Sequence, residues 1–232
     1  MTSEHRLKKD CKVELLTFDN VDGQKTFWHT ASHVLAQAVK RLYPNAKCAI
    51  GPAVDNGFYY DFDVEKPFSP EDLEKIKAEM KKIVKSGLEL ERVELSPEEA
   101  EKKLEEMNEP YKVELVKEHS DKGEHITFYK QGEFIDLCAG PHLMSVAPIK
   151  AIELTACTGA YWRGDANNAQ LCRVYGVAFP KASMLEEHLK KLEEAKLRDH
   201  NKLGRELEYF TTVDYVGQGL PILLPKGARV VQ

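Results

Sequence analysis

Residues 27–38 most constrain how this 232-residue chain can fold. Apolar side chains recur there at the spacing of an amphipathic helix of about four turns, namely Trp28, Ala31, Leu35, Ala38, Val39 and Leu42. His29 and His33 are four residues apart, so they share one face of that helix. This face lies more than about 90° from the apolar stripe, so both imidazoles are expected to point away from the helix's own core contact. Two close imidazoles suit metal binding, proton transfer or water positioning; a pair of surface histidines is the alternative.

The charge balance limits the partners that the chain can bind. Hydrophobic residues make up 42% and charged residues 31%, which allows a real core with a polar surface. The net charge is −5, so any contact with nucleic acid must come from local patches. Segments 75–85 and 190–205 are rich in Lys but interleaved with Glu, which is typical of a solvated helix face.

The sequence predicts a cytoplasmic protein without membrane contact. Residues 1–12 are charged and lack the apolar run of a secretory signal, and no stretch approaches the length of a membrane span. The five cysteines are scattered without a C-x-x-C motif, which favours a reducing compartment over a disulfide frame. The same compartment argues against reading Arg163-Gly164-Asp165 as a cell-adhesion tripeptide.

Several helix boundaries can be read from the sequence. Residues 69–71 and 96–98 both read Ser-Pro-Glu, with Ser as the cap, Pro in the first turn and the acid near the positive end of the helix dipole. Gly87 is expected to end the first of these helices. The histidine-bearing helix is expected to begin after a turn at Asp22-Gly23. Residues 181–207 predict one long charged helix with a single covered face.

Alternating and β-branched segments predict the strands. They are residues 12–18, 57–63, 88–95, 112–116, 126–130, 134–138, 149–157 and 171–179. Strands in runs with helices elsewhere favour an α+β fold with a mostly antiparallel sheet. The histidine-bearing helix is expected to pack on that sheet, and the long helix follows it.

A second group of chemically active residues lies at 136–142, which reads Asp-Leu-Cys-Ala-Gly-Pro-His. Alternation along a strand would bring Asp136 and Cys138 to the same side, and Gly140-Pro141 would turn the chain and present His142. Together with the helix, this gives one thiol and three imidazoles. Such a set could hold Zn²⁺ in a tetrahedron or line a metal-free hydrolytic pocket.

Five blocks resemble, in this order, the editing region of bacterial-type threonyl-tRNA synthetases. They are His-Thr-Ala-Ser-His at 29–33, Asp-Asn-Gly-Phe-Tyr-Tyr-Asp at 55–61, Pro-Tyr-Lys at 110–112, residues 136–142, and Gly-Ala-Tyr-Trp-Arg-Gly-Asp at 159–165. By this resemblance, residues 1–22 end a ubiquitin-like N-terminal (TGS) domain and 23–181 form the tRNA editing (second additional) domain. Residues 182–204 form a linker helix, and 205–232 open a class II catalytic domain. The ATP and threonine sites of that domain lie outside this sequence, so aminoacylation is not expected, and a homodimer is expected only through the missing part.

The resemblance implies an editing hydrolase. Serine lacks one methyl group of threonine, and a synthetic pocket rejects such an analogue by only about 1–3 kcal/mol. A second site can hydrolyse seryl-tRNA(Thr) and exclude threonyl-tRNA by its extra methyl. The family's functional residues match this chain at His29, His33, Tyr60, Lys112, Asp136, Cys138 and His142.

Ester hydrolysis needs an activated water, stabilisation of the oxyanion and a proton for the leaving hydroxyl. We expect Lys112 and His29 to hold and activate the water, and His33 and His142 to orient substrate or water. Lys112→Ala and His29→Ala are therefore expected to abolish deacylation and leave the fold intact. An ordinary edge-strand lysine is the alternative for Lys112.

The remaining residues are expected to bind the substrate or support the pocket. Asp136 would bind the amino group or hydroxyl of serine, and Tyr60 would pack against the substrate or the terminal adenosine. The alternatives are a turn-stabilising carboxylate for Asp136 and a core position for Tyr60. Cys138 needs no role as a nucleophile, because water attacks the ester.

No cofactor is expected for this hydrolysis. Alanyl-tRNA editing proteins resemble this region and hold zinc with the same ligand types, so His29, His33, Cys138 and His142 are the alternative zinc ligands. Four protein ligands would leave no position for water, and Lys112 would add positive charge beside the ion. The alternative functions are a zinc-dependent alanyl-type trans-editing hydrolase and a non-catalytic module that binds the tRNA 3′ end.

Overall fold

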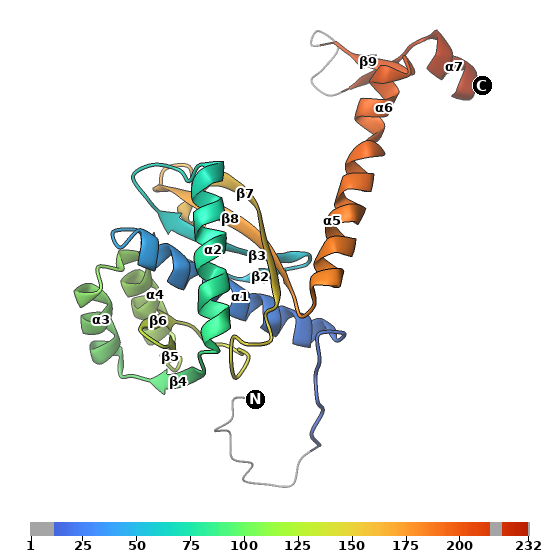
Figure 1. The fold of residues 1–232 in the computed structure, drawn as a ribbon. Coiled ribbons are helices and arrows are strands. Elements are labelled where there is room, and N and C mark those ends of the chain that lie inside the picture. The colour runs from blue at the N-terminus through green and yellow to red at the C-terminus, as the bar shows by residue number, and fades with distance from the viewer. Residues whose placement is uncertain (1–11, 214–219, 232) are drawn as a thin grey trace. The chain divides into compact units, whose positions relative to one another are not determined.

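The computed structural model describes residues 12–213 and 220–231 and combines helices with antiparallel sheets (Figure 1). The predicted α+β class is confirmed. The chain divides into two compact units, residues 1–185 and residues 186–232. Parts of the domains expected at the two ends, residues 1–11, 214–219 and 232, lie outside the described residues. Within the described ranges, no helix has the length and apolar content needed to cross a membrane.

The larger sheet of the first unit has the strand order β1-β3-β8-β7, with β2 also paired to β3. Its strands are β1 (Lys47–Cys48), β2 (Ala53–Val54), β3 (Gly57–Asp63), β7 (Ala151–Tyr161) and β8 (Gln170–Phe179). Alternate residues of β3 point to opposite faces, which brings Phe58, Tyr60 and Phe62 into the core. Helices α1 (Val21–Leu42) and α2 (Pro70–Ser86) contact this sheet (Figure 1). The strands predicted at 57–63, 149–157 and 171–179 are confirmed.

A smaller antiparallel sheet carries the second half of the predicted site. It consists of β4 (Leu90–Glu94), β5 (Thr127–Gln131) and β6 (Phe134–Leu137), as predicted for 88–95, 126–130 and 134–138. Helices α3 (Pro97–Glu106) and α4 (Pro110–Asp121) lie between β4 and β5 in the sequence. The strand predicted at 112–116 is wrong, because these residues belong to α4. Pro110 starts the helix, and Val113 and Val116 have the helical spacing that packs both on α3.

Helix α1 is longer and more deeply buried than its apolar pattern predicts. It begins at Val21, so Asp22-Gly23 lies inside its first turn rather than before it. Every residue from 27 to 39 except His29 is buried, and His33 is only 3% exposed. The alternative of a pair of surface histidines is therefore wrong. The segment after β6 covers this side of the helix, as the contact between His29 Nδ1 and the Pro141 carbonyl oxygen at 3.3 Å shows.

The two Ser-Pro-Glu helix starts are confirmed. Ser69 accepts a hydrogen bond from the Asp72 N–H at 3.2 Å, and Ser96 accepts one from the Glu99 N–H at 3.3 Å. In both cases the carboxylate of the acid accepts a hydrogen bond from the backbone N–H of the serine. Gly87 ends α2 with a left-handed φ of 64°, also as predicted. The strand predicted at 12–18 is wrong, because no strand in the described ranges pairs with this segment.

The long helix predicted at 181–207 is interrupted. Helix α5 (Ala182–Leu197) ends first, and Asp199 then caps α6 (His200–Glu206) by accepting a hydrogen bond from the Asn201 N–H at 2.8 Å. The rest of the second unit contains β9 (Phe210–Thr212), which pairs with β10 (Pro221–Leu223), and α7 (Pro225–Val231).

Candidate active site

A pocket of about 380 Å³ opens between α1, α4 and the end of β6. Five of the residues predicted from the sequence line it: His29, His33, Lys112, Asp136 and Cys138. They come from three segments far apart in the chain, so the fold of the first unit assembles the pocket. Its lining combines bases, a cation and a carboxylate, which is the set that acid–base chemistry requires.

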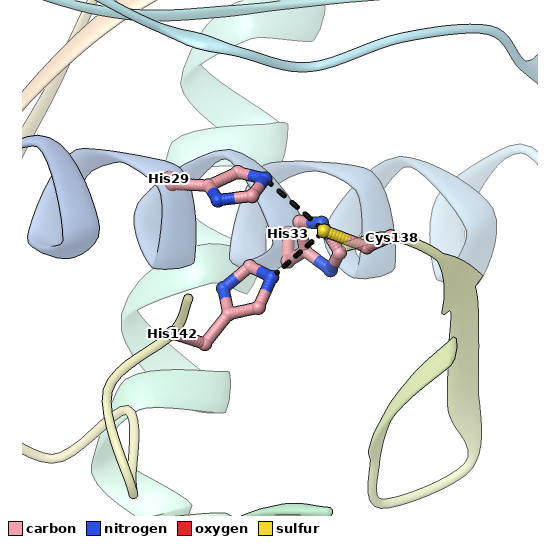
Figure 2. A group of neighbouring side chains, drawn as sticks. All are labelled: His29, His33, Cys138 and His142. Atoms are coloured by element: carbon pink, nitrogen blue, oxygen red, sulfur yellow. Dashed lines mark hydrogen bonds between the residues drawn. The ribbon is translucent and has the colours of Figure 1, made fainter. Parts of the chain in front are cut away.

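The histidines surround the thiol of Cys138. Figure 2 shows His29 and His142 turned toward the sulfur, which lies 3.3 Å from His29 Nε2 and 3.2 Å from His142 Nε2. The His33 ring lies beside that of His142, with centroids 4.2 Å apart. The fold thus brings the predicted histidine pair of α1 together with the predicted group at 136–142. The helical spacing of His29 and His33 and the turn before His142 make this possible.

The hydrogen bonds fix the tautomers of two imidazoles. The Pro141 carbonyl oxygen can only accept, so His29 Nδ1 carries the hydrogen and His29 Nε2 has the lone pair. The Thr30 hydroxyl donates to the Thr26 carbonyl oxygen, so at 3.2 Å it accepts from His142 Nδ1. Both Nε2 atoms are therefore acceptors that face the single S–H of Cys138. One S–H can satisfy only one of them, which leaves the other free to take a proton.

Burial keeps this cluster uncharged. Desolvation lowers the pKa of His29 and holds the pKa values of His33 and His142 well below the usual range, so the three imidazoles are neutral bases near pH 7. Desolvation also raises the pKa of Cys138 to about 12. The thiol is therefore protonated and a poor nucleophile.

Lys112 and Asp136 form a buried ion pair beside the imidazoles. Lys112 Nζ lies 2.9 Å from Asp136 Oδ1, and both side chains are 5% exposed. Asp136 Oδ2 accepts a hydrogen bond of 2.6 Å from the Tyr60 hydroxyl and lies 3.7 Å from His33 Nε2. Desolvation acts to lower the pKa of Lys112, but the Asp136 carboxylate outweighs it and raises that pKa, so Lys112 carries its charge. The pocket therefore contains one fixed cation next to neutral bases.

Two predicted residues do not reach the pocket surface. Tyr60 is 0% exposed and stacks on Phe62 in the core, so it has no surface to offer a substrate. The core position considered as its alternative is the correct one, and its hydroxyl supports Asp136. His142 lies behind Cys138 and is absent from the pocket lining.

Sequence reasoning missed the residues that hold these groups in place. Thr30 orients His142 and also accepts a hydrogen bond of 2.9 Å from the Leu143 N–H. Glu109, which precedes α4, pairs with Lys40 at 2.8 Å and accepts a hydrogen bond from the Cys48 N–H at 2.6 Å. Thr30 lies within the block at 29–33 and Glu109 precedes the Pro-Tyr-Lys block, so their position in or beside a motif was the available signal.

The thiol and imidazoles also fit a metal ion. His29, His33, Cys138 and His142 each offer one donor atom, and these atoms lie within 4.8 Å of one another. Neighbouring ligands of tetrahedral zinc are about 3.5 Å apart, given bonds of about 2.0–2.3 Å. His33 Nδ1 is buried without a hydrogen-bond partner among the described residues. The positive charge of Lys112 was expected to oppose an ion here, but Asp136 pairs with Lys112 and reduces that effect.

Comparison with known proteins finds relatives of the chain and a family model that matches part of it. Residues 126–175 match the family described as "Threonyl and Alanyl tRNA synthetase second additional domain". This segment of the chain is therefore similar to the second additional domain. It is also 60% identical over 226 residues to a threonine–tRNA ligase of Clostridium perfringens, 61% identical over 224 residues to that of Clostridium tetani, and 58% identical over 221 residues to that of Acetivibrio thermocellus. These matches cover 95–97% of this chain, which confirms the predicted resemblance.

The chain spans about a third of the length of these relatives, 34–35%. The matched part of the second additional domain includes Asp136, Cys138 and His142. His29, His33 and Lys112 precede it in the sequence. The pocket therefore combines residues of the matched segment with residues from α1 and α4.

Proposed function

We propose that this chain is an editing hydrolase that cleaves the ester of seryl-tRNA(Thr) to serine and free tRNA. The observation that carries the proposal is a single pocket in which charged Lys112 lies beside neutral His29. The similarity to threonine–tRNA ligases and the second additional domain support a tRNA substrate. A module that only bound the tRNA end would not need a buried cation and unprotonated bases together.

The residues divide the reaction between them. His29 Nε2 takes a proton from the attacking water when the Cys138 S–H bonds to His142 instead, and it gives this proton to the leaving hydroxyl of the tRNA as the ester bond breaks. Lys112 holds that water and counters the negative charge that develops on the carbonyl oxygen. An ionised carboxylate has about four lone-pair sites, so Asp136 can bind Lys112 and Tyr60 and still accept the amino group of serine. His33 orients the water from the inner side of the pocket.

A zinc-dependent version of this hydrolase is the second candidate, because the four donor atoms are close enough to hold the ion. Bound zinc would supply Lewis-acid polarisation of the ester carbonyl. Catalytic zinc sites have three protein ligands and an open position, whereas this cluster offers four donors. We therefore propose the metal-independent reaction.

Hydrolysis of seryl-tRNA(Thr) with sparing of threonyl-tRNA(Thr) is the expected result of a deacylation assay with the purified chain in excess over tRNA. The physical reason is the exclusion of one methyl group by the pocket, which can supply about 10- to 200-fold discrimination. Spontaneous hydrolysis of both esters without protein is the control. Equal cleavage of both esters, or cleavage of neither, would contradict the proposal.

A further inference from the structure

Helix α4 places Lys112, but little within the helix fixes its position. It has 12 residues, and helices of about 12–15 residues are marginal without tertiary contacts. Its buried residues are Lys112 and Val116, so one of the two is a charged side chain rather than an apolar anchor. Its cap residue, Glu109, makes no side-chain capping bond. The position of Lys112 therefore depends on contacts from other elements.

The tip of the β7–β8 hairpin makes such contacts. A short 3₁₀ helix, η1 (Trp162–Gly164), forms this tip, and Arg163 adopts a left-handed φ of 57° within it. The Arg163 guanidinium pairs with two carboxylates of α4, at 2.9 Å from Glu114 Oε1 and 2.6 Å from Glu118 Oε1. Trp162 Nε1 donates to the other oxygen of Glu114 at 3.1 Å. The hairpin tip thus binds one side of the helix over more than a turn.

The Trp162 ring holds the turn that contains Lys112. Trp162 is 6% exposed and packs with Tyr111 and Leu115, which flank Lys112 in the sequence. The Tyr111 and Trp162 rings lie edge to face with centroids 5.0 Å apart. The Tyr111 hydroxyl also donates to Asp63 Oδ2, at the end of β3, at 3.0 Å. The larger sheet therefore contacts α4 at residues that precede and residues that follow Lys112 in the sequence. These contacts come from the hairpin tip and from β3.

We propose that Arg163 and Trp162 are positioning residues for Lys112, and that the tripeptide Arg163-Gly164-Asp165 serves this contact. The inference rests on the proposed function for its catalytic consequence, but the position of Lys112 can be measured independently. Reacting groups displaced by about 1 Å can lose about 100-fold in rate, so a loosened α4 should slow hydrolysis without weakening tRNA binding.

Arg163→Gln tests the proposal because it removes both ion pairs at an exposed position. We expect a roughly 10-fold lower single-turnover rate of seryl-tRNA deacylation with unchanged half-saturation. Arg163→Lys should recover part of the rate, because it retains the charge. Arg92→Gln is the matched control, since the exposed Arg92 forms its ion pair, at 2.7 Å, with Glu94 of its own strand rather than with a carboxylate of α4. It should have the wild-type rate.

The second readout is acetylation of Lys112 by N-hydroxysuccinimidyl acetate, followed by mass spectrometry of peptides. Lys112 is protected by burial, and Arg163→Gln should raise its labelling several-fold relative to exposed lysines such as Lys75. Wild-type labelling and wild-type rate in Arg163→Gln would overturn the proposal. Increased labelling of Lys112 in a protein that never cleaves seryl-tRNA would support the positioning role and refute the proposed function instead. Equal increases at all lysines would indicate general unfolding and also overturn it.

Discussion

Lys112→Ala is expected to lower the single-turnover rate of seryl-tRNA deacylation by about 30- to 1,000-fold, which corresponds to about 2–4 kcal/mol of transition-state stabilisation. Lys112 is the charged donor that lines the pocket beside the proposed base, so its loss removes both a water ligand and the counter-charge. Rapid quench with excess protein measures the chemical step directly. A variant with near wild-type rate would contradict the proposed role of the lysine.

The same substitution is expected to destabilise the fold, contrary to the expectation from sequence. Removing one partner of a buried ion pair leaves the other charge uncompensated, at a cost of about 3–5 kcal/mol. Lys112 is 4% exposed, and its loss leaves the Asp136 carboxylate with Tyr60 but no cation. Urea unfolding measures the change. In Lys112→Met with Asp136→Leu, the stability should largely return and the activity should not, which separates the two effects.

His29→Ala is expected to lower the deacylation rate by about 100-fold or more, because it removes the proposed general base. Its effect on the free energy of unfolding should be small. His29 is the one residue between 27 and 39 that is not buried, and alanine favours the helix. In the described part of the chain, the hydrogen-bond contacts of its side chain are those with the Pro141 carbonyl oxygen and the Cys138 sulfur, both at 3.3 Å.

His119→Ala is the matched control for His29→Ala. His119 lines the same pocket, but its side chain is 42% exposed and pairs with Glu124 at 2.6 Å. Its loss should leave the rate within a few-fold of wild type. If His119→Ala were as impaired as His29→Ala, the base would have to lie elsewhere in the pocket.

The strands and helix caps were predictable because their signals are local. Gly57–Asp63 alternates at period two, and Ser69 and Ser96 each precede Pro and two acids, so neighbours along the chain determine the outcome. The segment that contains Lys112 was misread as a strand. Its short apolar run fits both the two-residue period of a strand and the 3.6-residue period of a helix. Only the packing of Val113 and Val116 on α3 distinguishes the helix from the strand.

Five of the residues that line the pocket could be predicted from the sequence, but the electrostatics of the pocket could not. Spacing placed His29 and His33 on one face, and the resemblance supplied Lys112 and Asp136. The pairing of that lysine and carboxylate, and the burial that keeps the imidazoles neutral, arise from tertiary contacts between α1, α4 and β6. The roles of Thr30 and Arg163 are likewise invisible in the sequence, because a hydroxyl or guanidinium carries no information about its distant partner.

The most direct test of the metal-independent mechanism measures zinc content and single-turnover deacylation together in the wild type and in Cys138→Ala. We expect both proteins to hydrolyse seryl-tRNA after chelation, with Cys138→Ala within about 10-fold of wild type, because a protonated thiol is a poor nucleophile and the proposed reaction uses no metal ligand. The opposite result is equally clear. This account would be contradicted if the wild type held one zinc ion and lost its activity after chelation. In that case Cys138→Ala would be depleted of zinc and inactive, and Lys112→Ala would be active.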